Sequence, residues 1–507
     1  MTTVLDHNFA RSENIRSRIV QFVGANEATA VVVLTVAGGA LRFFHLGYQS
    51  LWLDELFSVA VAHRDWMQVI VGSLQGDTNP PLFNLLLHLA LQLGSDETAA
   101  RAISVIFSIA TIPLFYLLAR DLFDAQVALL ATILLVINPF QLLFAQEARM
   151  YAQFGFLSLA AGFFVLRGLE SGRRTDWVLF DIAEALAFYT HSLAFLNLLA
   201  LDIFAATRRR SWSGLILGHG ILGILFAPWL VVFVGQAARV QAGFWGTAPM
   251  PTVLLTTPYL FMFSNVLPAV LVPPALFVAL ALLALALIAA GKSLAAHSVY
   301  ASGLAFALVS CLIPLLLLFA ISQVRPMFVE RTLLPSSFGL YIVIAWAIRR
   351  AQPRMLNLAL GSAAILLAVI GVANYYTNPL VQKPPMREAA AVVAASFQPG
   401  DLVVHTSDSS ALAFQYYAPA LPNIYLAGDP DYVAETTRGR TGRIAGLEPK
   451  ELEGAVAGYG RVWLVVALDH NVDYQLGRVR EMDGTFTRLS QRSVGGIDLL
   501  LYEPRRR

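Results

Sequence analysis

The chain has 507 residues, of which 57% are hydrophobic and only 13% are charged, whereas an ordinary globular chain carries roughly 25% charged residues. This composition, with a mean hydropathy of +0.64, excludes most soluble classes and predicts an integral membrane protein. The formal net charge of +2 is too small to indicate a nucleic-acid partner. The single cysteine, Cys311, lies in an apolar run and cannot form an internal disulfide.

Apolar segments of membrane length recur along residues 1–377. The first, at about 28–46, is interpreted as a retained helix rather than a signal peptide, because many further spans follow it. Segment 80–93 is short for a bilayer and has more features of a surface helix. Further crossings are predicted near 103–118, 127–144, 154–166, 177–189, 193–206, 215–234, 270–290, 299–321, 333–348 and 356–375. The sequence therefore predicts a polytopic α-helical protein with about 11 transmembrane helices.

Arginine and lysine gather in alternate loops, as expected of loops that stay in the cytoplasm. An N-terminus on the cytoplasmic side places the first outer loop (48–101), the other acidic or aromatic loops and the C-terminal tail on the extracytoplasmic side. We therefore expect a multi-pass protein of the cell membrane. The cytoplasmic cations would be Arg120, Arg167, Arg173, Arg174, Arg208, Arg209, Arg210, Lys292, Arg349, Arg350 and Arg354.

Residues 378–507 differ in character from the rest, with polar residues, prolines and short β-rich runs. Runs at 402–405, 424–426, 462–466 and 499–502 alternate with helical patterns at 385–397, 449–456 and 472–482, which predicts a small extracytoplasmic α/β domain. The basic segment 439–446 is either a solvated loop or a contact for an anionic glycan or lipid.

Two adjacent carboxylates, Asp54 and Glu55, follow the first apolar segment. A charge at the membrane surface is retained only where water, a cation or a cationic group faces it. This stretch is therefore the first candidate for a functional site, although acids also occur in the loops of any polytopic protein.

Three further outer stretches contain candidate groups. In the first, Asp77 and Asn79 precede Pro80 and Pro81, a pattern that also fits a capped helix entrance. In the second, Glu147 and Arg149 are two residues apart on a predicted helix, so we expect each to have its own partner. The third stretch carries two arginines that are either membrane-surface anchors or phosphate ligands, Arg325 and Arg331.

Aromatic and histidine side chains near the outer surface have two interpretations each. Trp52, Trp66, Phe244 and Trp245 either line a sugar or lipid groove or belong to the membrane interface. The histidines lack metal-ligand spacing and fit satisfied polar groups better than ligands, namely His45, His63, His88 and His191.

Taken together, these stretches resemble the polyprenyl-phosphate-dependent glycosyltransferases of the GT-C fold, in the branch related to protein O-mannosyltransferases (family 39) and lipid A aminoarabinose transferases. The resemblance covers the first two hundred residues well and the later spans loosely. It departs at Asn79, where many relatives carry His, and at Thr332, which replaces an aromatic residue. The matching motifs are LWLDE at 51–55, NPPLF at 79–83, Arg101, NPF at 138–140, QEARMYA at 146–152, YTH at 189–191 and RTLLP at 331–335.

The resemblance implies transfer of a sugar from a polyprenyl- or dolichyl-phosphate carrier to a glycan, lipid or protein acceptor by an inverting displacement. It implies that Asp54 is the catalytic base, assisted by Glu55, and that arginine holds the lipid phosphate. Asp54, Glu55 and Glu147 would be the oxygen ligands if a divalent cation (Mg, Mn or Ca) were required. The implied substrate-binding residues are Asp77, Asn79, Arg101, Glu147, Arg149, Tyr151, His191, Arg325 and Arg331.

Two functions from other classes compete with the enzyme. A transporter or flippase of lipid-linked sugars would use the acids as coupling sites, but transporters place such groups near the midplane and often show paired half-repeats. A non-catalytic relative would only bind lipid-linked glycan. The acidic pair at one face and the large outer tail favour the enzyme.

Overall fold

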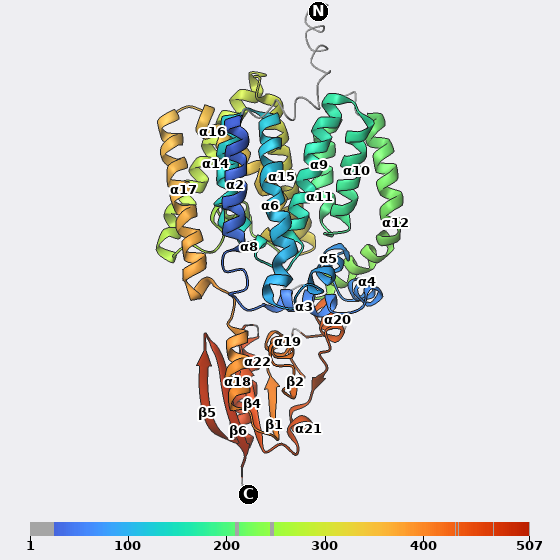
Figure 1. Ribbon diagram of the computed structural model, residues 1–507, viewed down its shortest axis with the longest axis vertical. Coiled ribbons are helices and arrows are strands. Elements are labelled where there is room, and N and C mark those ends of the chain that lie inside the picture. The colour runs from blue at the N-terminus through green and yellow to red at the C-terminus, as the bar shows by residue number, and fades with distance from the viewer. Residues whose placement is uncertain are drawn as a thin grey trace, which may run out of the picture.

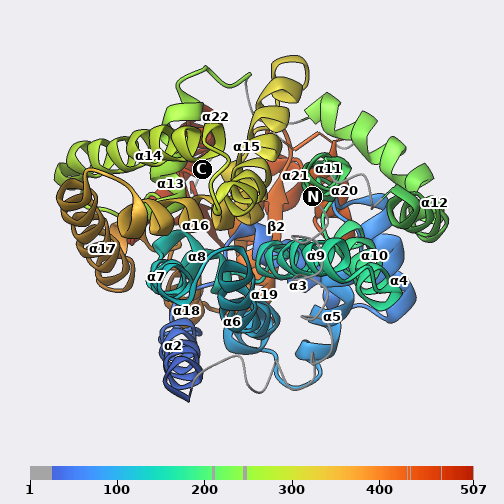
Figure 2. The ribbon, with the colours of Figure 1, turned by 90° about the horizontal axis from the view of Figure 1, so that it is seen from above.

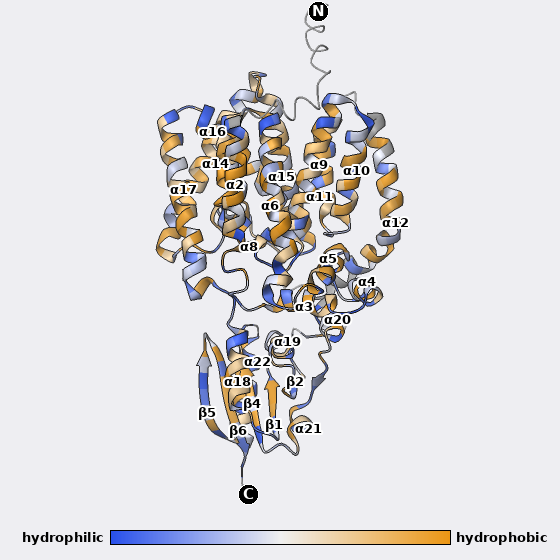
Figure 3. Ribbon diagram, in the orientation of Figure 1, coloured by the Kyte–Doolittle hydropathy of each residue, from blue (hydrophilic) through white to orange (hydrophobic). Residues whose placement is uncertain are grey.

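The computed structural model describes residues 25–207, 212–243, 248–430, 432–433, 436–469 and 471–505. A bundle of helices leads into a smaller sheet domain at the C-terminal end (Figure 1). Apolar residues dominate the bundle, whereas polar residues gather at its ends and over the sheet domain (Figure 3). The predicted class, a helical membrane protein with a small C-terminal α/β domain, is confirmed.

The bundle is formed by long apolar helices that stand side by side. Within the described residues, seven helical stretches are long and apolar enough to cross a membrane, or eight if α7 and α8 form one bent span. Helices α9 and α16 lie in the middle, whereas α12 and α17 lie outside (Figure 2). The bundle as a whole, with its shorter helices included, consists of α2 (Ala25–Phe43), α6 (Glu97–Leu122), α7 (Ala125–Val136), α8 (Pro139–Ala145), α9 (Tyr151–Ser171), α10 (Arg174–Phe188), α11 (Ala194–Ala206), α12 (Trp212–Gly243), α13 (Val253–Phe263), α14 (Val272–Ala295), α15 (Ala301–Val324), α16 (Leu334–Arg350) and α17 (Arg354–Thr377).

The span predicted at 127–144 is broken. Helices α7 and α8 meet at an angle of 57°. Pro139 cannot continue the first helix, and Asn138 caps the second by accepting a hydrogen bond from the Gln141 N–H at 3.1 Å. The Asn138 amide also donates to the Phe261 carbonyl at 3.0 Å, which fixes the bend against α13. The bend directs residues 146–150 toward the end of the bundle that faces the sheet domain.

Three short helices cover that end of the bundle (Figure 1). They are α3 (Leu53–Ala62), α4 (Trp66–Gln75) and α5 (Leu82–Leu91). Asp65 caps α4 by accepting from the Gln68 N–H at 2.9 Å. The prediction of a surface helix rather than a crossing at 80–93 agrees with α5, which is only 10 residues long.

The opposite end of the bundle carries the cations of the predicted cytoplasmic loops. Arg120 at the end of α6 pairs with Glu27 at the start of α2, at 3.1 Å. Arg350 at the end of α16 pairs with Asp124, which caps α7. The predicted triplet 208–210 lies outside the described residues.

The C-terminal domain has a six-stranded sheet in the order β3-β2-β1-β4-β6-β5. Side chains alternate between its two faces: Val403 packs with α18 and α19, whereas Leu402 and Val404 pack with α21 and α22. The strands are β1 (Asp401–His405), β2 (Asn423–Leu426), β3 (Pro449–Lys450), β4 (Arg461–Val466), β5 (Phe486–Val494) and β6 (Ile497–Pro504). The helices are α18 (Met386–Ser396), α19 (Asp408–Tyr417), α20 (Thr437–Ile444), α21 (Leu452–Val456) and α22 (Val472–Thr485).

The basic segment 439–446 is not a solvated loop. It lies largely in α20, which packs against α3, α4 and α12. Thr441 is buried, and its hydroxyl donates to the Gly76 carbonyl at 2.6 Å. Arg438 pairs with the buried Asp408.

Candidate active site

A cavity of about 1010 Å³ opens where the bundle meets the C-terminal domain. Helix α3, the segment before α5, the α8–α9 connection and the turn before α16 contribute to its walls. Aromatic and aliphatic side chains such as Phe57, Phe140 and Leu260 line much of it. Seven of the predicted site residues line the cavity: Asp54, Asp77, Asn79, Arg149, Tyr151, His191 and Arg331.

Asp54 lies in the first turn of α3 and is paired with Arg331, which lies 277 residues later in the sequence. Its Oδ2 lies 2.9 Å from Nη2 of Arg331, and both side chains are 23% exposed. The Arg331 guanidinium also lies over the rings of Trp52 and Tyr151, at 5.5 and 5.4 Å. The carboxylate and the guanidinium are therefore held in place but remain open to the cavity.

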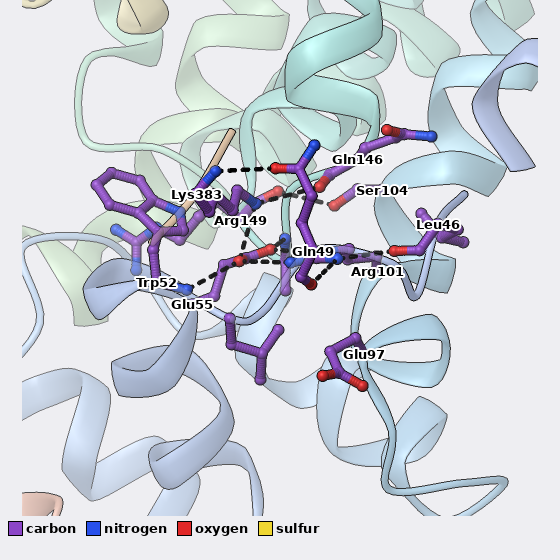
Figure 4. A network of polar contacts seen from close by, with 12 residues as sticks. Leu46, Gln49, Trp52, Glu55, Glu97, Arg101, Ser104, Gln146, Arg149 and Lys383 are labelled. Atoms are coloured by element: carbon purple, nitrogen blue, oxygen red, sulfur yellow. Dashed lines mark hydrogen bonds and ion pairs between the residues drawn. The ribbon is translucent and has the colours of Figure 1, made fainter. Parts of the chain in front are cut away.

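Glu55 has the opposite environment, because its carboxylate is fully buried (Figure 4). Arg101 binds it with two hydrogen bonds, of 2.8 and 3.0 Å, and Lys383 Nζ lies 2.8 Å away. The N–H groups of Ala148 and Trp52 donate to it at 2.8 and 3.3 Å. Burial alone would raise the pKa of Glu55, but Arg101 and Lys383 outweigh it and lower the pKa to about 2.

This geometry does not bring Glu55 to the cavity. Its oxygens already accept five hydrogen bonds or ion pairs from the protein, and it does not line the cavity. Arg101 does not line the cavity either. Arg101 uses all five of its N–H groups on Glu55 and on the carbonyls of Leu46, Gln49 and Ser50. Both residues instead hold the loop that precedes α3.

Arg149 contacts the backbone of Asp54 and keeps one N–H group without a hydrogen-bond partner. Its Nη1 donates to the Ser58 hydroxyl at 2.9 Å and to the Asp54 carbonyl at 3.3 Å. Its Nε is buried and has no hydrogen-bond partner. As predicted, Arg149 and Glu147 do not pair with each other. An unpartnered guanidinium N–H beside a cavity is suited to an anion that enters from the cavity.

Glu147 is buried beside the site and does not line the cavity. Its Oε1 has no hydrogen-bond partner. Burial raises its pKa to about 7, even though Lys383 and Arg331 act in the opposite direction. Direct substrate binding, as expected for Glu147, would require the surrounding side chains to move.

Asp77, Asn79 and His191 form one polar wall. Asp77 Oδ1 accepts from the N–H groups of Thr78 and Asn79, at 2.6 and 3.1 Å, in a tight turn before α5. Asn79 in turn accepts from the Ser192 N–H at 3.4 Å. His191 Nδ1 accepts from the Leu193 N–H at 3.0 Å, and burial together with Arg149 and Arg331 lowers the pKa of His191 to about 3. The imidazole is therefore neutral, and its Nε2 carries the proton.

The remaining candidate residues lie away from the cavity or are engaged by cationic side chains. Arg325 is exposed at the end of α15 and does not line the cavity. Asp54, Glu55 and Glu147 do not form a cation site, since Glu55 is occupied by Arg101 and Lys383 and Asp54 by Arg331. In the part of the chain that the structure describes, no three His, Cys, Asp or Glu side chains are placed to hold a metal ion. Phe244 and Trp245 lie outside the described residues.

The C-terminal domain brings Ser409, Arg438, Thr441 and Asp469 to the cavity, more than 300 residues from Asp54. A glycan or lipid contact was one of two predictions for the basic segment 439–446, which contains Thr441 and follows Arg438. No local motif marks Ser409 or Asp469, because their proximity depends on how the domain docks. Lys383, just beyond the last predicted span, was considered only as a group that could approach the lipid phosphate, whereas its Nζ lies 2.8 Å from Glu55.

The chain has the fold of a polytopic helical membrane protein with a small C-terminal α/β domain. Residues 78–233 match the family model described as dolichyl-phosphate-mannose-protein mannosyltransferase. No curated protein sequence matches the chain significantly.

Solved structures show the same fold. ArnT from Cupriavidus metallidurans, in its apo state, superposes with a TM-score of 0.64 at 14% identity, covering 94% of this chain and 98% of that chain. ArnT bound to undecaprenyl phosphate gives 0.61 at 13% identity, covering 93% and 97%. The oligosaccharyltransferase of Archaeoglobus fulgidus, in complex with Zn and sulfate, gives 0.53 at 12% identity, covering 94% and 73%. The expected GT-C fold is thereby confirmed.

Proposed function

We propose that the protein is a membrane glycosyltransferase that moves a sugar from a polyprenyl- or dolichyl-phosphate carrier to an extracytoplasmic acceptor by an inverting displacement. One observation carries the proposal: Asp54, Arg149 and Arg331 face a largely apolar cavity of about 1010 Å³ at one end of the bundle. The match to a dolichyl-phosphate-mannose-dependent family and the fold shared with ArnT, which binds undecaprenyl phosphate, support the same class of donor.

In this proposal the apolar wall holds the polyprenyl chain, and the lipid phosphate takes up the N–H groups of Arg331 and Arg149. The planar guanidinium matches two phosphate oxygens at once. Engagement of Arg331 by phosphate would release Asp54 from its ion pair.

Asp54 would then accept the proton of the acceptor hydroxyl. The acceptor oxygen forms a bond to the anomeric carbon from the face opposite the phosphate. The bond between that carbon and the phosphate oxygen breaks, and the lipid phosphate leaves as an anion held by the two arginines.

The transport alternative has one observation in its favour. Carboxylates also lie inside the bundle, where Glu184 is buried and neither of its oxygens has a hydrogen-bond partner. Ionisable groups at such depth often serve transport. Movement of a fluorescent lipid-linked sugar across proteoliposomes, undiminished in an Asp54→Asn variant, would favour the transporter.

The test of the enzyme uses the purified full-length protein, radiolabelled polyprenyl-phosphate sugars and envelope extract as the acceptor. Asp54→Asn keeps the side-chain shape but removes the base, so transfer should fall by about 10²–10⁴-fold while binding of the donor persists. Asp473→Asn, an exposed position on α22, is the matched control and should transfer normally. Transfer by Asp54→Asn at the normal rate would contradict the assignment of the base.

A further inference from the structure

The sheet of the C-terminal domain contains a topological switch point. From β1 the chain passes to β2 and β3 on one side, and then returns to β4 on the other side of β1. In open α/β sheets, ligands bind in the crevice beyond the carboxyl ends of the two strands that flank such a point. Here those strands are β1 and β4, and their carboxyl ends are followed by polar residues.

Ser407 and Ser409 follow β1, and Asp469 follows β4. The Ser407 hydroxyl donates to Asp469 Oδ2 at 2.9 Å, and the Ser409 hydroxyl donates to the same oxygen. Gln475 Nε2 donates to the other carboxylate oxygen at 3.1 Å. These contacts fix the carboxylate across the switch point, and we call Ser407, Ser409 and Asp469 the switch-point edge.

The switch-point edge faces the bundle. The arrow of β1 points toward the bundle in Figure 1. Ser409 and Asp469 line the same cavity as Asp54 and Arg331. The cavity therefore has one wall from the bundle and one from the carboxyl ends of the two parallel strands β1 and β4.

The two walls differ in the cations that they offer. The bundle contributes the carboxylates of Asp54, Asp77 and Glu330 together with Arg149 and Arg331, and the two guanidinium groups suit a phosphate. The domain contributes Asp469 and Arg438, but both ends of the Arg438 guanidinium are already bound to Asp408, each at 2.6 Å. The domain wall thus offers hydroxyls and a carboxylate, which bind the hydroxyl groups of a neutral sugar and repel an anion.

We infer that the switch-point edge is the acceptor site, and that the acceptor is a neutral, hydroxyl-rich glycan. This inference rests on the proposed function for the transfer step, but binding of the glycan is measurable without any donor. The glycan occupies the cavity that Ser409 and Asp469 share with Asp54, with the hydroxyl that is to be glycosylated directed toward Asp54.

The test measures saccharide binding to the full-length protein in nanodiscs by saturation-transfer NMR. The probes are three neutral trisaccharides (mannotriose, maltotriose and N-acetylchitotriose), the anionic trigalacturonate and an uncharged Ser/Thr-rich peptide. At least one neutral trisaccharide should bind, and more tightly than trigalacturonate or the peptide. Asp469→Asn should weaken it roughly tenfold or more, as expected for a hydrogen bond to a charged group, and Ser409→Ala should weaken it severalfold.

Asp473→Asn is again the matched control and should bind the trisaccharide normally. Binding of lipid-linked donor should be unchanged in Asp469→Asn, which separates this inference from the proposed function. The acceptor assignment would be overturned if none of the three neutral trisaccharides bound, or if the protein preferred the peptide. It would also be overturned if Asp469→Asn and Ser409→Ala both bound the trisaccharide with wild-type affinity. Absence of donor turnover by the wild-type protein would instead overturn the proposed function.

Discussion

Replacing Glu55 by Gln should destabilise the protein strongly. The substitution leaves Arg101 and Lys383 buried without their common counter-ion, and breaking a buried ion pair from one side typically costs about 3–5 kcal/mol. The pKa of Glu55 gives a similar magnitude. Its fall from 4.5 to about 2 corresponds to about 3 kcal/mol in the free energy of unfolding.

The sign of the pH dependence follows from that lowered pKa. The contribution of Glu55 is complete above about pH 4.5 and is lost as the pH falls toward 2, because the unfolded chain binds a proton there before the folded chain does. Thermal unfolding in detergent, at a fixed scan rate, should show a lower midpoint for Glu55→Gln at pH 7. The gap to the wild-type protein should narrow toward pH 3.

Glu388→Gln is the matched control. The Glu388 side chain is 47% exposed and also pairs with an arginine, so its loss should cost no more than about 1 kcal/mol. Equal unfolding midpoints for Glu55→Gln and Glu388→Gln at pH 7 would refute the structural role of Glu55.

Three other measurements address the site and its orientation. Arg331→Lys should weaken binding of a polyprenyl-phosphate sugar by about 10-fold or more, because lysine cannot reproduce the paired hydrogen bonds; unchanged binding in both the Lys and Ala variants would remove Arg331 from the site. Because the pKa of Glu147 is raised from 4.5 to about 7 in the folded protein, the wild-type protein should lose thermal stability as the pH rises through about 7. Glu147→Gln should abolish this loss, and an unaltered pH profile in the variant would contradict the burial of Glu147 as a neutral acid. A cysteine replacing Asp473 should react with an impermeant reagent on intact cells, and a cysteine replacing Arg354 should not; the reverse pattern would place the site in the cytoplasm.

The fold was largely predictable because it follows from local patterns. Hydropathy located the long spans, and four β-rich runs located β1, β2, β4 and β6. Hydropathy missed the break at Asn138, because composition does not reveal a bend between two apolar helices. Strand β5 was missed because seven of its nine residues are exposed, so it lacks the alternation that marks a half-buried strand.

The site was predictable only in part. The family motifs identified Asp54, Arg149 and Arg331, which the fold brings to one cavity. They implied that Asp54 is the base, but also that Glu55 assists it at the same site. Adjacent residues of a helix point about 100° apart, so one carboxylate faces the cavity and the other faces Arg101. Which of the two faces the cavity depends on long-range contacts that no motif records.

The contacts between the C-terminal domain and the loop before α3 have a consequence for biosynthesis. The Leu51 N–H donates to the Tyr417 hydroxyl at 2.7 Å, and that hydroxyl donates to Glu97 at 2.9 Å. Arg101 can bind the loop soon after its synthesis, but Tyr417 comes more than 300 residues later. The full set of contacts to the loop therefore forms only after translation has passed Tyr417 and the C-terminal domain has folded. An incompletely synthesised chain already inserted in the membrane would lack the wall of the cavity that this domain supplies.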